Sequence, residues 1–382
     1  MSRKVVGPVL LVLLLVGVAA GIYYSAGDQR AAEAQAARQA AMVTVRGLVG
    51  SEKMPFLQDA RLQAVSERHG LRLEVRKAGS REMAFSPELK DQDFAFPAGA
   101  PGAAKIKESQ RSGQEITPFF TAMAIASWRP LAELLEQQGI VRRSSDAWYV
   151  VDMPKLLRWM SEGKRWRDIP GNTAFAVSKS VLVSTTDVRK SNSAAMYLAL
   201  ASYLLNNNEV VAGEAAAQRV LPALTPLFLK QGYQESSSAG PFDDYLTMGM
   251  GKAPLVMVYE AQYIEYLART PAAQRNPDMV LLYPSPTVFT KHTLVPLTEN
   301  GARLGRLLAE DPEIQTIAAE YGLRINNSRV FKEMQQSRGI VVPENLIDVV
   351  DPPAYEWLER RSQAIERQMQ YRRHRQRVAP RH

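Results

Sequence analysis

The hydrophobic pattern begins with an uninterrupted apolar run near the N-terminus. Residues 5–24 are VVGPVLLVLLLVGVAAGIYY, twenty residues without a charge, and two basic residues precede them. Twenty helical residues cover roughly 30 Å, the hydrocarbon thickness of a bilayer. A transmembrane anchor and a cleavable secretory signal both fit residues 1–27. The pair Tyr23 and Tyr24 favours the anchor, because aromatic side chains gather at membrane interfaces.

The next segment, residues 28–41, has the sequence DQRAAEAQAARQAA. It consists of strong helix formers without an apolar stripe, which predicts a solvated helical stalk. An anchor and a signal would both export the rest of the chain. We therefore expect a single-pass protein of the inner (cytoplasmic) membrane of a bacterium, with its main domain in the periplasm or extracytoplasmic space.

From residue 42 onward, short β-rich runs alternate with helical ones. The first three are VTVRGLVG, the helical PFLQDARLQAVSERHG, and LRLEVRKAG, an order that predicts two parallel strands. Three more β-rich runs, AVSKSVLVSTTD, APLVMVYEAQ and MVLLYPSP, each precede a helical pattern. The sequence thus predicts an α/β fold with mainly parallel sheets. Residues 94–114, centred on FAFPAGAPGAAK, are predicted to form an excursion or a flexible loop.

The last predicted helix covers residues 354–375. Tyr355, Leu358, Ile365 and Met369 form one apolar stripe on it. Such stripes usually pack on the body of the same protein, so we expect this helix to dock there. The arginines that follow predict a solvated tail.

Composition and charge exclude several classes of protein. The chain of 382 residues has no cysteine, which excludes disulfide scaffolds, thiol nucleophiles, cysteine zinc clusters and lipid attachment through a cysteine. Its net charge is +8, but residues 360–382 hold eight Arg and one Glu. Seven of the eight net charges therefore lie in the tail, and the body is nearly neutral. Because a basic tail is not a basic groove, we expect no nucleic-acid partner.

Catalytic patterns are equally sparse. The four histidines are scattered, and no HExxH, GxSxG or P-loop pattern occurs. The adjacent carboxylates at 243–244 and 310–311 point apart on a helix or strand and have no metal-ligand companion at useful spacing. We therefore expect a protein that is not an enzyme and that needs no metal or cofactor.

Small polar and charged residues follow the predicted strands, where ligands of open parallel sheets bind. Hydroxyl groups and backbone N–H groups at helix starts hold anions or polar ligand groups. Each such residue could also be an ordinary helix cap. Their recurrence at five strand ends favours a ligand site. The candidates are Ser51, Glu52, Lys53, Ser80, Arg81, Thr117, Thr186, Asp187, Ser191, Asn192, Ser193, Tyr259 and Glu260.

An ordered series of segments carries a family resemblance. SWRPL is followed about forty residues later by WRDI, and then by TTD and SNSAAMYLAL. This series, and the order of elements over residues 43–324, resembles the extracytoplasmic solute-binding proteins of ABC transporters, which have the type II periplasmic-binding-protein fold. The resemblance implies a two-lobe protein that clamps a ligand by hinge closure. It also implies lobe 1 at residues 42–126 and 279–350, lobe 2 at 127–278, and a C-terminal helix and tail at 351–382.

The resemblance implies which lobe carries each candidate. Ser51 and the Ser80–Arg81 pair would lie on lobe 1, Thr117 near the hinge, and the candidates from Thr186 to Glu260 on lobe 2. Cationic and acidic candidates oppose each other, so the charge of the ligand stays open. The implied function is to capture a small polar or anionic ligand, with an ABC permease or another membrane protein as partner.

Two features depart from the family pattern. The chain has a predicted anchor instead of a cleaved signal or lipidated cysteine, and it continues for about forty residues beyond the expected fold. A second function therefore stays open: a ligand-independent extracytoplasmic scaffold or sensor domain of a membrane stress-related complex.

Overall fold

The computed structural model describes residues 41–231, 234–346 and 348–378. The predicted anchor at residues 1–27 lies outside the described residues, as does all but the last residue of the predicted stalk. Over the described ranges, no helix is both long and apolar enough to span a bilayer.

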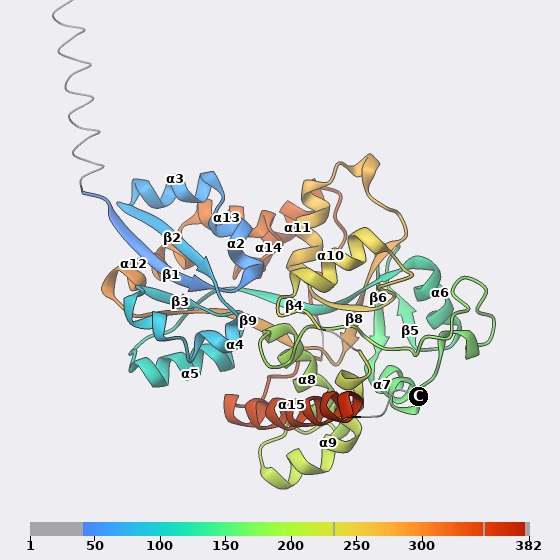
Figure 1. Ribbon diagram of the computed structural model, residues 1–382. Coiled ribbons are helices and arrows are strands. Elements are labelled where there is room, and N and C mark those ends of the chain that lie inside the picture. The colour runs from blue at the N-terminus through green and yellow to red at the C-terminus, as the bar shows by residue number, and fades with distance from the viewer. Residues whose placement is uncertain (1–40, 232–233, 347, 379–382) are drawn as a thin grey trace, which may run out of the picture.

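A mixed sheet of nine strands runs through the molecule. The strand order is β2-β1-β3-β9-β4-β8-β6-β5, and β7 pairs with β4 beside this path. Figure 1 shows β4, the longest strand, passing from one half of the molecule to the other. The strands are β1 (Val43–Val49), β2 (Leu71–Lys77), β3 (Phe94–Phe96), β4 (Ile116–Trp128), β5 (Val141–Arg143), β6 (Trp148–Asp152), β7 (Val256–Tyr259), β8 (Met279–Ser285) and β9 (Phe289–Pro296).

The helices divide between the two halves, which we call lobe 1 and lobe 2. Lobe 1 is built on β1, β2, β3, β9 and the first half of β4, and lobe 2 on β5 to β8 and the second half of β4. The helices of lobe 1 are α2 (Met54–Leu57), α3 (Ala60–Arg68), α4 (Ser80–Met83), α5 (Ala100–Gln110), α12 (Glu299–Glu310), α13 (Pro312–Glu320) and α14 (Ser328–Ser337). Those of lobe 2 are α6 (Arg129–Gln137), α7 (Met153–Glu162), α8 (Asn192–Leu205), α9 (Glu214–Leu229) and α10 (Ala239–Met248). Helix α11 (Glu260–Arg269) contributes side chains to the cores of both lobes. The last helix is α15 (Tyr355–Val378).

The apolar pattern of each strand explains where it lies. In β2, Leu71 and Leu73 are buried while Arg72 and Glu74, which alternate with them, are exposed, as the two-residue period of a strand requires. In β7 every residue is buried, because helices and strands cover both of its faces. Apolar clusters lie on both faces of the lobe 1 sheet, one under α3 and α12 and the other under α4 and α5.

The expectation of mainly parallel sheets is corrected. The pairs β1–β2, β1–β3 and β6–β8 are parallel, but β4 runs antiparallel to β7, β8 and β9. Alternating strands and helices show that strands are separated along the chain, but they do not show which strands become neighbours. Here β4 passes between the lobes and runs opposite to β9 in lobe 1 and to β7 and β8 in lobe 2, so the central pairings are antiparallel.

The prediction of a loop at residues 94–114 is also wrong. Its first residues form β3, whose three side chains are buried, and α5 follows from Ala100 to Gln110. Pro101 stands in the first turn of α5, where a missing N–H costs nothing. The proline thus starts a helix where the sequence suggested a break.

The expected strand at residues 176–187 does not form either. Ser180 and Ser184 make isolated bridges to Arg165 and Val256, and the rest of the segment is irregular. Valines 181 and 183 are nevertheless fully buried in the lobe 2 core. Their burial explains the β-like pattern of the segment.

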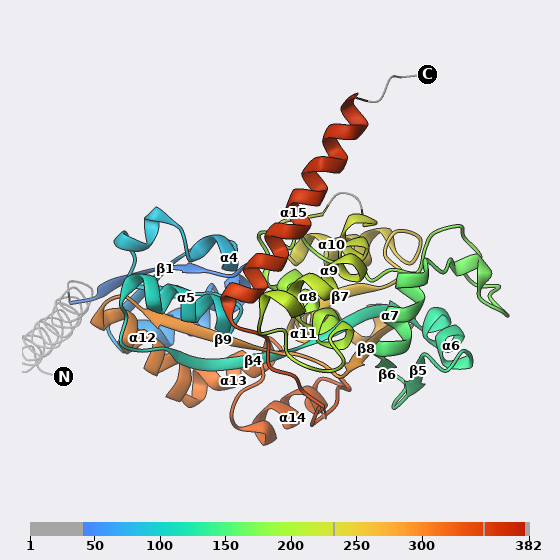
Figure 2. The same cartoon turned by 90° about the horizontal axis from the view of Figure 1, so that it is seen from below.

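The C-terminal helix docks on the body as expected. Leu358 and Ile365 of α15 are buried in the lobe 2 core, and Met369 packs against it. Tyr355, at the start of the same stripe, packs instead near Phe85, which belongs to lobe 1. Figure 2 shows the C-terminal part of α15 pointing away from the body.

Candidate functional site

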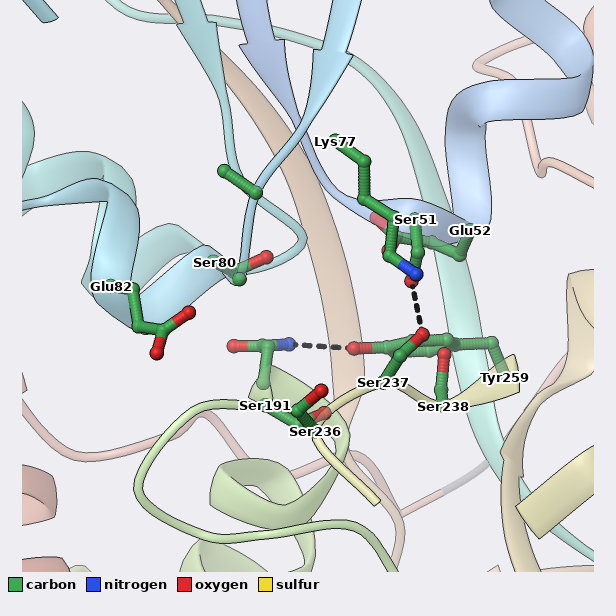
Figure 3. Close-up of a pocket in the computed structure, with 13 residues that line it drawn as sticks. Ser51, Glu52, Lys77, Ser80, Glu82, Ser191, Ser236, Ser237, Ser238 and Tyr259 are labelled. Atoms are coloured by element: carbon green, nitrogen blue, oxygen red, sulfur yellow. Dashed lines mark hydrogen bonds between the residues drawn. The ribbon is translucent and has the colours of Figure 1, made fainter. Parts of the chain in front are cut away.

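A small polar cavity lies between the two lobes. Its volume is about 60 Å³, which is room for a few groups the size of a water molecule. Both lobes contribute side chains to it, as Figure 3 shows. The lining residues are Ser51, Glu52, Lys77, Ala78, Gly79, Ser80, Glu82, Ser191, Asn192, Ser236, Ser237, Ser238 and Tyr259.

The lobe 1 wall comes from the ends of β1 and β2. These strands are parallel and in register, so the segments that follow them meet at one edge of the sheet. Ser51 begins a short 3-10 turn directly after β1, and Ser80 is the first residue of α4 after β2. The Ser80 hydroxyl accepts a 2.9 Å hydrogen bond from the backbone N–H of Ala98, which holds it in place.

The lobe 2 wall comes from the starts of α8 and α10 and the end of β7. Asn192 donates a 3.2 Å hydrogen bond from Nδ2 to the hydroxyl of Tyr259. Ser191 precedes α8 but makes no capping hydrogen bond, because its hydroxyl lies 3.0 Å from that of Ser193. The first N–H groups of α8 therefore keep their partial positive charge without a side-chain cap.

The two walls touch across the cavity. The hydroxyl of Ser51 lies 2.9 Å from that of Ser237, joining lobe 1 to lobe 2. A Cβ added to Gly99 would clash with the side chain of Asn192, so this glycine permits the close approach of α8. The structure thus shows the lobes in contact around the cavity.

Three ionisable side chains form the floor below Ser51. Lys53 is fully buried and pairs with Glu52, whose side chain is only 4% exposed. The Lys53 ammonium also lies 3.3 Å from Nδ1 of His292, which is itself fully buried. Nε2 of His292 is buried and has no hydrogen-bond partner among the described residues.

Burial controls the charge states of this floor. It lowers the pKa of Lys53, although the Glu52 carboxylate acts in the opposite direction. Burial, together with the nearby Lys53 charge, lowers the pKa of His292 well below its usual value. The imidazole is therefore neutral at neutral pH. The pKa of Tyr259 is raised well above its usual value, first by burial, so its phenol keeps its proton.

The charges at the cavity are only partly paired. Glu52 pairs with Lys53, and Glu82 lies 3.2 Å from the ammonium of Lys190. Lys77 has no carboxylate partner among the described residues, and Figure 3 shows its side chain extending into the cavity. Hydroxyl groups, a free ammonium and a helix start are a donor set suited to a small anion. Across the described ranges no group of three or more His, Asp or Glu is arranged to hold a metal ion.

The structure brings part of the predicted set to this cavity. Lys53 does not line the cavity itself, but it pairs with Glu52, which does. The candidates that line it are Ser51, Glu52, Ser80, Ser191, Asn192 and Tyr259.

Four other candidates support the walls from behind or face elsewhere. Thr186 is buried and its hydroxyl lies 2.7 Å from that of Ser193, so the two tie the loop before α8 to that helix. Asp187 forms an ion pair with Arg189, whose Nε donates a 2.8 Å hydrogen bond to its Oδ1. Thr117 lies on the exposed first part of β4, 2.9 Å from the hydroxyl of Thr293.

Glu260 and Arg81 have partners of their own. Glu260 is fully buried and accepts hydrogen bonds from Arg324 Nε at 2.6 Å and from the Tyr283 hydroxyl at 2.6 Å. Arg81 is buried and pairs with Glu359 on α15. Neither side chain lines the cavity.

Sequence reasoning missed several lining residues. Lys77 and Glu82 flank the Gly-Ser turn after β2, and Ser236 to Ser238 precede α10. The run ESSSAG was a visible signal for a polar helix start, but it follows no predicted strand. His292 had no signal at all, because its approach to Lys53 joins residues 239 positions apart.

Solved structures with the same fold identify the architecture. The sulfate-binding protein SubI from Mycobacterium tuberculosis H37Rv is 13% identical, with a TM-score of 0.52 over 81% of this chain and 94% of that one. The periplasmic binding protein AfuA from Actinobacillus pleuropneumoniae, with fructose-6-phosphate bound, is 10% identical, with a TM-score of 0.53 over 85% and 97%. The apo ferric ion-binding protein A from Pasteurella haemolytica is 10% identical, with a TM-score of 0.51 over 86% and 98%.

These likenesses confirm the predicted two-lobe α/β fold of type II periplasmic binding proteins. All three are binding proteins. No protein-family model matches the chain, and no curated protein sequence matches it.

Proposed function

We propose that this protein is an extracytoplasmic solute-binding protein that clamps a small anion between its two lobes and delivers it to an ABC-type permease. The observation that carries the proposal is the polar cavity where Ser51 of lobe 1 meets Ser237 of lobe 2. In a hinged protein, a ligand that contacts both walls stabilises the closed arrangement. The proposal includes an N-terminal membrane anchor at residues 1–27 and a periplasmic main domain.

The balance of charge supports an anion over a cation. Both acidic side chains at the cavity already have lysine partners. Lys77, in contrast, has no carboxylate partner among the described residues. An added cation would meet no free carboxylate there. An oxyanion would meet Lys77, the serine hydroxyls and the start of α8.

A ligand panel tests this proposal directly. The full-length protein in detergent would be heated with sulfate, phosphate, molybdate, sugar phosphates, amino acids and polyamines. A ligand at 100 times its dissociation constant stabilises the folded state by about 2.7 kcal/mol, which a thermal-shift assay resolves. We expect one class of oxyanion to raise the melting temperature.

A double variant and a control variant test whether the ligand binds in the cavity. Asn192→Ala combined with Ser237→Ala removes one donor from each of two lobe 2 segments and should abolish the ligand-induced shift without unfolding the protein. Ser337→Ala is the control, because this exposed serine lies at the end of α14, away from the cavity. An unchanged shift in the double variant would show that the ligand binds elsewhere. No shift with any compound would favour the scaffold or sensor function.

A further inference from the structure

The C-terminal helix α15 contacts both lobes. On lobe 2 it lies along α9 and buries Leu358 and Ile365 in the core. Arg189 of lobe 2 lies 3.5 Å from Glu366 on the same helix. These contacts fix α15 to lobe 2, so the helix moves with that lobe.

On lobe 1 it contacts α4 and α5, through an ion pair and aromatic side chains. Glu359 pairs with Arg81 of α4, whose side chain is 6% exposed. The Arg81 guanidinium also lies 5.8 Å from the centroid of the Tyr355 ring, and that ring lies 6.3 Å from Phe85. The three side chains Arg81, Glu359 and Tyr355 thus form a latch between the lobes, which we call the Arg81 latch.

The Arg81 latch adjoins the wall of the ligand cavity. Arg81 directly follows Ser80, which lines the cavity, and its backbone N–H donates a 3.4 Å hydrogen bond to the carbonyl of Lys190. Lys190 in turn precedes Ser191 on the opposite wall. A movement that separates the lobes must therefore separate Arg81 from both Lys190 and Glu359.

We propose that α15 is a strap that holds the lobes together through the Arg81 latch and thereby sets how readily the cleft opens. This proposal rests on the proposed function in one respect: the cleft that α15 controls is the cleft that binds the ligand. Glu359 is the only carboxylate paired with Arg81 among the described residues. This ion pair forms only where the lobes meet, so its attraction favours that arrangement.

The docked helix also buries a cation that has no partner among the described residues. Arg361 is 1% exposed, and its three side-chain nitrogens have no hydrogen-bond partner among the described residues. Docking α15 therefore buries one uncompensated cation, which offsets part of the gain from Leu358 and Ile365.

The absence of cysteine allows a clean test of the strap. Glu67→Cys on α3 and Glu162→Cys on α7 place spin labels at exposed positions on lobe 1 and lobe 2. Pulsed electron paramagnetic resonance then measures the distance between the lobes in the full-length protein, with and without sulfate as the probe. Glu359→Gln breaks the latch. Glu366→Gln is the matched control, because it makes the same change on the same helix within lobe 2.

We expect Glu359→Gln to lengthen and broaden the distance distribution without sulfate, while the parent protein and Glu366→Gln keep a short one. If the closed fraction falls to about a tenth, the apparent dissociation constant of the bound anion rises about tenfold. Circular dichroism would confirm folding. If Glu359→Gln fails to fold, Tyr355→Leu, which removes the ring beside Arg81, replaces it with the same expectation.

The other results separate this proposal from the proposed function. Identical distributions in Glu359→Gln and the parent would overturn the strap, even if sulfate still binds. Equal broadening in both variants would also overturn it, because the effect would then come from docking within lobe 2. If Glu359→Gln opens the cleft but sulfate does not change the distance or the melting temperature of any form, the strap stands and sulfate binding fails.

Discussion

Replacing Glu260 with Gln tests whether this carboxylate holds the fold together or binds the ligand. The side chain is fully buried, and both of its oxygens accept hydrogen bonds: Oε1 from Arg324 Nη2 at 2.8 Å and from Tyr283, and Oε2 from Arg324 Nε. Arg324 also donates to the backbone carbonyls of residues 343 and 344, so the pair ties α11 to the segment beyond α14.

The magnitude follows from these contacts. Glutamine keeps one acceptor but turns an NH2 group toward a donor, so at least one charge-assisted hydrogen bond is lost, at about 1.5–3 kcal/mol. Arg324 also loses its only carboxylate partner among the described residues. Breaking a buried ion pair from one side costs about 3–5 kcal/mol in all. We expect Glu260→Gln to lower the free energy of unfolding by that amount.

Equilibrium unfolding in urea measures the change. Glu299→Gln is the control, because it breaks an exposed ion pair to Arg306 and should change the free energy of unfolding by less than about 1 kcal/mol. Ligand affinity should stay within about twofold in both variants. The reasoning is refuted if Glu260→Gln keeps its stability and loses ligand binding, since Glu260 would then be a ligand residue as its sequence position suggested.

Three further predictions follow from single side chains. Lys77→Met removes the unpaired ammonium at the cavity and should weaken anion binding by about tenfold or more in titration calorimetry; equal affinity would argue against an anionic ligand. His292→Gln should reduce the loss of stability on acidification. The pKa of His292 is depressed in the folded protein, so below about pH 6.5 the unfolded chain gains a proton that the folded protein excludes. Urea unfolding at pH 7.5 and at pH 5 measures the difference in the free energy of unfolding. Arg361→Met removes a buried cation whose pKa burial lowers to about 10, and it should raise the free energy of unfolding by about 1–4 kcal/mol; a loss of stability would reveal a partner for Arg361.

Local sequence patterns predicted many elements well. The runs at 43–49 and 71–77 form parallel strands joined through helices, and the apolar stripe of the last helix docks as expected. The polar strand ends in lobe 1 also lie at one edge of the sheet, where Ser51 and Ser80 line the cavity. These features depend on periodicity and on the order of strands and helices, which the sequence contains.

The pairing of strands and of buried charges depended on contacts between distant residues. Residues 94–114 contain enough Gly and Pro to suggest a loop, but packing against β1 and β9 makes them a buried strand and a helix. Glu260 follows a strand, as a ligand residue would, yet its carboxylate pairs with Arg324, sixty-four positions away. Helix and strand periods are local properties of the chain, whereas the partner of a buried charge is decided by which segments the fold brings together. The sequence alone therefore determined many of the elements and the polar strand ends, and the tertiary structure decided which polar side chains face the cavity and which ones neutralise one another.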